Sequence, residues 1–209
     1  MKKKIAIAID AMGGENAPSK NIKGLSIFLN KNKMNNDFHF YLYGDEKLIN
    51  EKLSKYKVDR NNLEIVHTSS VVSDEETPLT AIKNSKNTSM WNCINHQLEG
   101  KSDISLSAGN TGVLLVISRM ILKMMSEVSK PALAGLWPSQ SGTSVVLDLG
   151  ANIECSSKNL LDFSIMGASL YTSLYPNDKP NVALLNIGSE EFKGNETIKE
   201  TYQILNDKK

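Results

Sequence analysis

The 209-residue chain is poor in cysteine. Its two cysteines, Cys93 and Cys155, lie far apart and lack the spacing of metal ligands. This scarcity excludes a disulfide-stapled scaffold, gives no support for a zinc site and favours a reducing compartment. The chain also lacks an excess of either charge, since 24 basic and 23 acidic residues leave a formal net charge of +1. A protein of this balance has no field that would gather nucleic acid, so nucleic acid is not an expected partner.

Long apolar runs are missing as well. The longest apolar segment, residues 113–125, is interrupted by Arg119 and Lys123, and it falls short of the roughly 20 apolar residues that a membrane span requires. The apolar run 5–9 follows a basic start but is broken at Asp10, which makes it too short for a secretion signal. A cytoplasmic location is therefore expected.

Two common nucleotide motifs are absent from the sequence. There is no G-x-x-x-x-G-K-[ST] loop, and no G-x-G-x-x-G follows the first apolar run. These absences disfavour ATP and NAD. No cofactor and no metal are expected.

What the chain does contain is a regular alternation of short apolar runs and longer stretches of helical periodicity. The short runs have the length and composition of buried strands, and they cover residues 5–9, 38–43, 63–67, 104–107, 132–136, 144–148 and 182–186. The helix-like stretches cover residues 17–30, 46–56, 85–99, 111–125, 159–175 and 195–205. This alternation predicts an α/β fold with a mostly parallel sheet covered on both faces. We expect one domain over residues 1–209, with an exposed loop at about 69–80.

Four loops rich in glycine and small polar residues follow apolar runs at comparable places. They are residues 10–14, 105–112, 148–152 and 186–195. A strand that ends in such a loop and then opens a helix leaves N–H groups unpaired at the positive end of that helix, which suits an anion. In an open parallel sheet ligands bind beyond the carboxyl ends of the strands. The sequence therefore predicts one crevice for a small oxyanion, lined by neutral donors and few cations.

Each loop also has a purely structural interpretation. The Gly13 and Gly14 pair could serve a tight turn that needs positive φ, while Asp10 could cap a helix or brace a neighbouring loop. Cys155 could act as an acyl-accepting thiolate, but no histidine lies near it in sequence, and cysteine is commonly a small buried apolar residue. We favour the structural interpretation of Cys155.

Taken together, the loops resemble the bacterial phosphate acyltransferase family PlsX of phospholipid synthesis. The matching segments are Ile-Asp-Ala-Met-Gly-Gly-Glu-Asn-Ala-Pro (9–18), Ser-Ala-Gly-Asn-Thr-Gly (107–112), Leu-Asp-Leu-Gly-Ala-Asn-Ile-Glu-Cys (147–155) and Leu-Asn-Ile-Gly-Ser-Glu-Glu-Phe-Lys-Gly-Asn-Glu (185–196). The resemblance implies conversion of acyl-[acyl carrier protein] and inorganic phosphate to acyl phosphate and free carrier protein. It also implies a three-layer α/β/α sandwich related to phosphotransacetylases and isopropylmalate-type dehydrogenases, a homodimer, and peripheral contact with the cytoplasmic face of the membrane.

The resemblance directs the choice of site residues. The expected catalytic residues are Lys193, Asn110 and Asn186. The residues expected to bind phosphate or substrate are Asp10, Gly13, Gly14, Ser107, Gly109, Thr111, Gly112, Asp148, Gly150, Asn152, Gly188, Glu191, Gly194 and Asn195. Lys193 could instead be a surface cation, and Glu191 could be a helix cap rather than a base.

The chain departs from the family pattern in two places. After Pro78 the family usually has arginine and paired lysines before Ser-Ser-Met, where this chain reads Ala-Ile-Lys-Asn-Ser-Lys-Asn-Thr-Ser-Met (81–90). Family members also continue well beyond the position of Lys209, so the chain corresponds to the N-terminal part of the family's chain. The alternative is therefore an incomplete fragment that binds phosphate or the carrier protein without turnover. A decarboxylating dehydrogenase of the same fold would need a dinucleotide motif and paired aspartates, which we do not find.

Overall fold

The computed structural model describes residues 3–31, 37–73, 75–140, 142–188 and 193–207. The chain divides into two compact units, residues 1–123 and residues 124–209, and each is described by itself. The expectation of a single domain over the whole chain stays a prediction. Within the described residues, no helix combines the length and the apolar character needed to cross a membrane.

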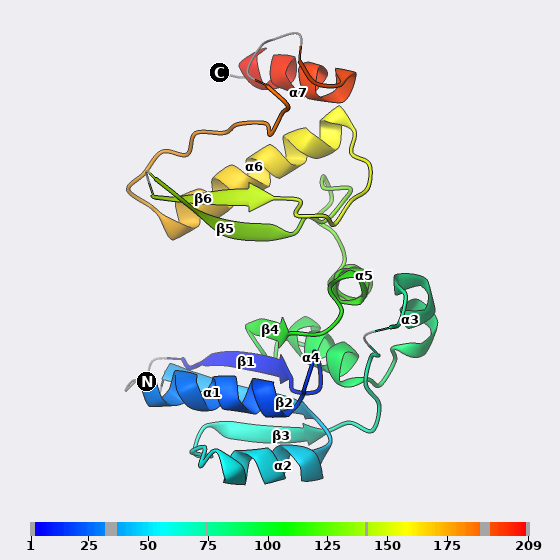
Figure 1. Ribbon diagram of the computed structural model, residues 1–209, viewed down its shortest axis with the longest axis vertical. Helices are drawn as coiled ribbons and strands as arrows, with labels where there is room; N and C mark the ends of the chain where they lie inside the picture. Colours follow the sequence, from blue (N-terminus) through cyan, green and yellow to red (C-terminus); the bar gives the residue numbers. More distant parts are fainter. Residues whose placement is uncertain (1–2, 32–36, 74, 141, 189–192, 208–209) are drawn as a thin grey trace. The chain divides into compact units, whose positions relative to one another are not determined.

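The first unit is built on a four-stranded parallel sheet with the order β3-β2-β1-β4 (Figure 1). Its strands are β1 (Ile5–Asp10), β2 (Phe38–Gly44), β3 (Leu63–His67) and β4 (Ile104–Ser107). The chain runs outward from β1 through β2 to β3, and then returns to place β4 on the other side of β1. The direction of strand addition therefore reverses between β1 and β4.

Helices cover both faces of this sheet. The helices of the first unit are α1 (Ser19–Lys31), α2 (Glu46–Lys55), α3 (Pro78–Asn84), α4 (Ser89–Leu98) and α5 (Thr111–Leu122). Successive strand residues point to opposite faces, so Ile7 of β1 joins a buried cluster with α1 and α2, whereas Ala8 packs with Cys93 of α4. A further buried cluster joins α3, α4 and α5. The first unit thus has three layers, α/β/α.

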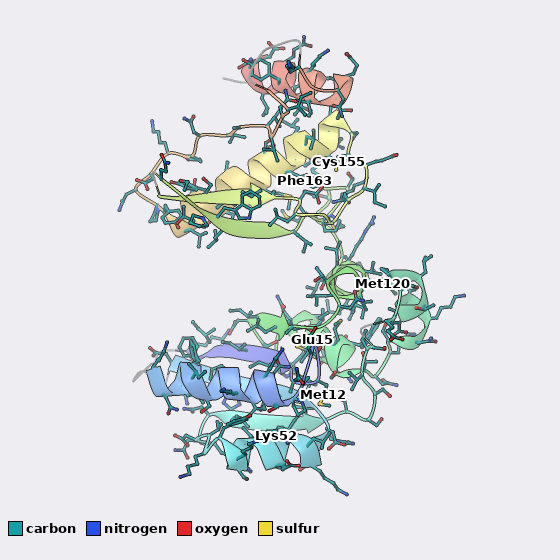
Figure 2. All side chains as sticks on the ribbon, in the orientation of Figure 1. Met12, Glu15, Lys52, Met120, Cys155 and Phe163 are labelled. Atoms are coloured by element: carbon teal, nitrogen blue, oxygen red, sulfur yellow. The ribbon has the colours of Figure 1, made fainter. Side chains whose placement is uncertain are left out.

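The second unit contains a two-stranded antiparallel sheet and two helices. Its elements are β5 (Ala134–Ser139), β6 (Gly142–Leu147), α6 (Ser157–Leu174) and α7 (Glu196–Asp207). Helix α6 packs against β6, and α7 packs against α6. Phe163, labelled on α6 in Figure 2, is the buried apolar residue of this unit among the residues that the structure describes.

The predicted α/β class with a mostly parallel sheet is confirmed. One local prediction is wrong, and another differs in its boundary. Residues 182–186 form no strand, because a strand exists only where a neighbour completes its hydrogen bonds, and an apolar run in the sequence does not reveal that neighbour. The predicted exposed loop at 69–80 ends early, because Thr77 accepts a hydrogen bond from the Thr80 N–H and Pro78 takes the first helical position of α3. Proline is well suited to that position.

Candidate functional site

The loops after β1 and β4 lie at the point where the strand order reverses. Open α/β sheets bind ligands in the crevice beyond the carboxyl ends of the strands at such a point. The two strands are hydrogen-bonded neighbours, and Asp10 at the end of β1 pairs in register with Ser107 at the end of β4. Two of the four predicted loops, 10–14 and 105–112, are therefore brought together.

These two loops approach each other so closely that only glycine fits between them at two positions. A Cβ atom on Gly13 would lie 2.5 Å from Asp10 Oδ2 and 2.9 Å from the Gly109 backbone nitrogen. Gly14 has φ +88°, and a Cβ atom there would lie 2.4 Å from the Ala108 carbonyl oxygen. The predicted glycine role is thus close approach as well as turn geometry.

Asp10 links the two loops through hydrogen bonds. Its side chain is 1% exposed, and Asp10 Oδ2 accepts a hydrogen bond from Ser107 Oγ at 2.7 Å. Ser107 Oγ in turn accepts one from the Gly109 N–H at 3.1 Å. Burial raises the pKa of the Asp10 carboxyl, while the hydroxyl of Ser89 and then that of Ser107 act in the opposite direction. Asp10 and Ser107, both predicted as phosphate-binding residues, therefore contact each other.

Asn110 caps α5. Its Oδ1 accepts a hydrogen bond from the Val113 N–H at 3.1 Å, and its Nδ2 donates one to the Glu76 carbonyl oxygen at 3.1 Å. Both ends of the amide of this predicted catalytic residue thus have structural partners. Among the described residues, no acceptor contacts the N–H groups of Thr111 and Gly112 in the first turn of α5. These donors lie at the positive end of the helix dipole and suit an anion.

Two supports of this region were not found by sequence reasoning. Asn21 of α1 donates to the carbonyl oxygens of Ala11 and Gly13, both at 2.9 Å, and so clamps the loop after β1. Pro78, at the start of α3, lies where a Cβ atom on Gly112 would approach its Cγ to 3.2 Å. An asparagine inside a helix carries no signal of such a long-range clamp, whereas the Thr-Pro pair at 77–78 is a helix-start signal that could have been recognised.

The third loop, residues 148–152, belongs to the second unit and is closed by its own side chains. Asp148, with φ +64°, accepts hydrogen bonds at its Oδ1 from the Asn152 N–H at 3.2 Å and from Asn152 Nδ2 at 2.9 Å. Gly150 has φ +80°. Cys155 Sγ donates to Asp148 Oδ2 at 3.5 Å. Burial, helped by this carboxylate, raises the pKa of the Cys155 thiol, which disfavours a reactive thiolate.

The fourth loop joins the stretch after α6 to α7. Asn186 Nδ2 donates to the Lys193 carbonyl oxygen at 3.1 Å, and a Cβ atom on Gly194 would lie 2.7 Å from Asn186 Oδ1. Asn195 Oδ1 accepts from the Ile198 N–H at 3.0 Å in the first turn of α7. Lys193 and Gly188 are partly buried. The predicted residue Glu191 lies outside the described residues.

The four predicted loops belong to two different units of the chain. The loops 10–14 and 105–112 meet in the first unit, whereas 148–152 and 186–195 belong to the second unit. A shared crevice of all four loops stays a prediction, as do the catalytic and binding roles of their residues. Among the described residues, no group of histidine, cysteine, aspartate and glutamate side chains could hold a metal ion.

Comparison with known proteins identifies the family. Residues 5–209 match the model of a family described as "Fatty acid synthesis protein". The chain belongs to this family. A phosphate acyltransferase from Pelagibacter ubique is 55% identical over 208 residues, which are 99% of this chain and 60% of the relative. A phosphate acyltransferase from Rhodopseudomonas palustris (strain TIE-1) is 40% identical over 206 residues, 98% of this chain and 58% of the relative. The resemblance to bacterial phosphate acyltransferases is confirmed, and the family member described here spans about three fifths of the length of these curated relatives.

Two solved structures with a similar fold are phosphotransacetylases. EutD phosphotransacetylase from Staphylococcus aureus has a TM-score of 0.65 at 15% identity, with 100% of this chain and 65% of that chain covered. A phosphotransacetylase from Streptococcus pyogenes has a TM-score of 0.66 at 13% identity, with 98% of this chain and 66% of that chain covered. At these identities the likeness concerns the fold alone, and it agrees with the predicted relation to phosphotransacetylases.

Proposed function

We propose that the chain carries the phosphate-binding part of an acyl-[acyl carrier protein]:phosphate acyltransferase. The proposed reaction converts the acyl carrier thioester and inorganic phosphate to acyl phosphate and free carrier protein for phospholipid synthesis. Family membership supports acyl transfer in lipid synthesis. The observation that carries the assignment of phosphate is the pair of first-turn N–H groups of Thr111 and Gly112 at the reversal point of the sheet.

In this proposal the phosphate is both ligand and nucleophile. An oxygen of hydrogen phosphate attacks the thioester carbonyl carbon, a new C–O bond forms and the C–S bond breaks. The proton of hydrogen phosphate ends on the departing sulfur, so that acyl phosphate and the carrier thiol are the products. The reaction needs no covalent enzyme intermediate, which agrees with the raised pKa of Cys155. Orientation of phosphate against the thioester and stabilisation of the developing oxyanion are the two tasks of the protein.

Helix α5 supplies the donors for the first task. Its first-turn amides and the hydroxyl of the exposed Thr111 would hold the phosphate at the positive end of the helix dipole. For the second task we propose Lys193 and Asn186, with Asn152 and Asn195 as further polar groups near the substrate. Each well-placed oxyanion donor is worth about 10²–10³ in rate. Asn110 would contribute by capping α5 and thereby presenting its amides.

The larger assembly forms part of the proposal. We expect a homodimer in the cytoplasm that contacts the membrane surface peripherally and takes its acyl group from acyl carrier protein. The second candidate is a module that binds phosphate or the carrier protein without turnover. Its supporting observation is the apolar stretch before α7, where Leu185 is 88% and Ile187 is 84% exposed, because exposed apolar side chains in one segment suit a binding surface.

Phosphate binding can be tested by removing both proposed donors of Thr111, its backbone N–H and its hydroxyl, with Thr111→Ala beside it to remove the hydroxyl alone. Thr111 is the first residue of α5, and the preceding Asn110 has φ −55° and ψ 116°, a conformation that a following proline accepts. Thr111→Pro should therefore keep the helix and raise the Kd for inorganic phosphate at least tenfold, measured by calorimetry. Ser157→Pro is the matched control, because Ser157 is the first residue of α6 and follows an extended Ser156. Equal phosphate affinity in both variants would refute the proposed phosphate site.

Turnover is tested by phosphate-dependent release of carrier protein from an acyl-loaded carrier. The 209-residue chain should be weakly active or inactive beside the Pelagibacter ubique phosphate acyltransferase. A hybrid with this chain in place of the matching 208 residues of that relative should be active. In the hybrid, Lys193→Ala or Asn110→Ala should lower turnover at least tenfold, about 1.4 kcal/mol of transition-state stabilisation, whereas Cys155→Ser should leave it largely intact. An inactive Cys155→Ser hybrid would favour an acyl-cysteine route instead.

A further inference from the structure

Asp10 is placed where a direct ligand of an anion would be unfavourable. Its carboxylate is 1% exposed, and it lies between the two loops that flank the proposed phosphate site. Like charges repel strongly in a buried environment, so an ionised carboxylate beside phosphate would weaken binding. No lysine, arginine or histidine among the described residues forms an ion pair with it. A carboxylate in this position therefore calls for a role other than contact with the anion.

The hydrogen bonds of Asp10 indicate that role. A serine hydroxyl has one proton to donate, and Ser107 donates its proton to Asp10 Oδ2 at 2.7 Å. A lone pair of Ser107 Oγ accepts the Gly109 N–H at 3.1 Å. While Asp10 is ionised, Ser107 therefore has no proton to donate to an anion, and its hydroxyl holds the backbone of the loop instead.

This chain of contacts ends at the start of α5. Gly109 is followed by the cap residue Asn110 and then by the first-turn donors Thr111 and Gly112. The other oxygen of Asp10, Oδ1, accepts the Met12 N–H at 3.3 Å, so the same carboxylate braces both loops. Gly13 leaves no space for a side chain between the two loops, so they lie in close contact beside Asp10.

We propose that Asp10 is a positioning residue: it acts through Ser107 to hold the loop 107–110 so that the first-turn amides of α5 face the anion. The proposal rests on the proposed function in taking that anion to be phosphate. It reassigns Asp10 and Ser107 from ligands of phosphate to supports of the loop that presents the ligands. The anion contacts then begin at Thr111.

The test follows the amide resonances of Thr111 and Gly112 by NMR during titration of the 209-residue chain with inorganic phosphate. Asp10→Ala and Ser107→Ala should each raise the phosphate Kd at least fivefold. The Kd of the double variant should be no higher than the higher of the two single-variant values, because both residues act through one contact. Asp10→Asn should stay within about threefold of the unchanged chain, since its amide oxygen can still accept the Ser107 proton, although its amide nitrogen cannot accept the Met12 N–H. Asp45→Asn, at the cap of α2, is the matched control and should bind phosphate normally.

Several results would overturn the inference. If Asp10→Ala binds phosphate more tightly, the carboxylate acts only by repulsion. If the two alanine effects add in the double variant, Asp10 and Ser107 act separately. A loss in Asp10→Asn equal to that in Asp10→Ala would assign the effect to the charge or to the Met12 contact and not to Ser107. Should Asp10→Ala fail to fold, Ser107→Ala and Asp10→Asn decide the question alone. If phosphate shifts neither amide resonance in the unchanged chain, the proposed phosphate site itself is wrong. If phosphate shifts them but the alanine variants bind with the same Kd as the unchanged chain, only the role of Asp10 is refuted.

Discussion

Single glycine residues decide how closely the loops after β1 and β4 approach. Gly14 combines a positive φ with contact to the Ala108 carbonyl, so a side chain there meets both backbone strain and a clash. Gly24, in the exposed part of α1, has no atom within 4 Å of the position where a Cβ would lie. The different surroundings of the two glycines give them opposite effects on stability.

Alanine at these two glycines should change stability in opposite directions. Gly14→Ala should lower the free energy of unfolding by about 1–3 kcal/mol, the cost of a strained left-handed residue, with the Ala108 contact adding to it. Gly24→Ala should raise it by about 0.5–1 kcal/mol, because alanine loses less backbone entropy in a helix. Urea unfolding monitored by circular dichroism measures both changes. A destabilised Gly24→Ala variant, or a neutral Gly14→Ala variant, would contradict the close-approach argument.

His96 should make stability depend on pH. It is 8% exposed and its ring centroid lies 4.4 Å from that of Tyr41. Burial, followed by the positive charge of Lys101, lowers the pKa of His96 below its usual value of 6.5. The unfolded chain therefore takes up a proton before the folded chain does, so this contribution to stability is complete above about pH 6.5 and is lost as the pH falls through the folded pKa.

The measurement is the free energy of urea unfolding between pH 7.5 and pH 5. His96→Phe keeps an aromatic ring beside Tyr41 and removes the titrating group, so the variant should lose less stability over this range than the unchanged chain. Identical pH profiles for the two proteins would show that His96 does not titrate differently on folding.

At the scale of helices and strands, the same residue types occur at the N-termini of helices whether they cap the helix or line an anion pocket, so the two roles look alike in sequence. Several helices begin at a side-chain cap, and these caps are Asp45, Thr77, Thr88, Asn110 and Ser156. Small polar residues are chosen at such positions because they accept a first-turn N–H. The same residue types would line an anion pocket, so only the remaining unpaired donors distinguish the two, and those depend on the three-dimensional surroundings.

Two substitutions of Asn110 can separate the contributions to stability of its hydrogen bonds to Val113 and to Glu76. Asn110→Ala loses the cap of α5 and the link to the Glu76 carbonyl, and it should lower the free energy of unfolding by about 1–2 kcal/mol. Asn110→Asp keeps an acceptor for the Val113 N–H but loses the donor to Glu76, so it should retain the stability that belongs to the cap. Thermal and urea unfolding of both variants provide the comparison. Equal losses in the two variants would place the whole effect in the link to Glu76.

At the scale of the whole chain, the buried apolar residues are concentrated in the first unit. Among the described residues, every buried apolar side chain except Phe163 lies within residues 1–123. These side chains fill the space between the parallel sheet and its covering helices, and the space between α3, α4 and α5. Apolar burial is the main stabilising term in folding, so the first unit has the means to fold by itself.

A fragment of residues 1–123 should therefore fold cooperatively. It should give a dispersed amide NMR spectrum and a single unfolding transition, because it retains the complete four-stranded sheet and its covering helices. A fragment of residues 124–209 should show neither property, since Phe163 is its buried apolar residue in the described part of that unit. A poorly dispersed spectrum for residues 1–123 would show that its stability depends on the second unit.

Local sequence signals predicted much of the fold. The strands at 63–67 and 104–107 were placed with both boundaries correct, because short β-branched runs between polar segments carry their own signal. The run 182–186 has the same appearance but forms no strand, since pairing depends on a partner that no local pattern specifies. In the candidate site, the sequence located both loops of the first unit and left open whether Asp10 binds the ligand or braces a neighbouring loop, but it overlooked Asn21.

The sequence by itself determined the alternation of strands and helices, the positions of the glycine-rich loops and the family, because these depend on residue order and local conformational preference. Tertiary structure alone decided which groups face one another. Asp10 and Ser107 are 97 residues apart and meet only because β4 returns to the side of β1. Their contact uses the hydroxyl proton that an anion would otherwise receive. Which donors remain unpaired at the start of α5 is thus set by long-range packing, which brings together groups that no local pattern relates.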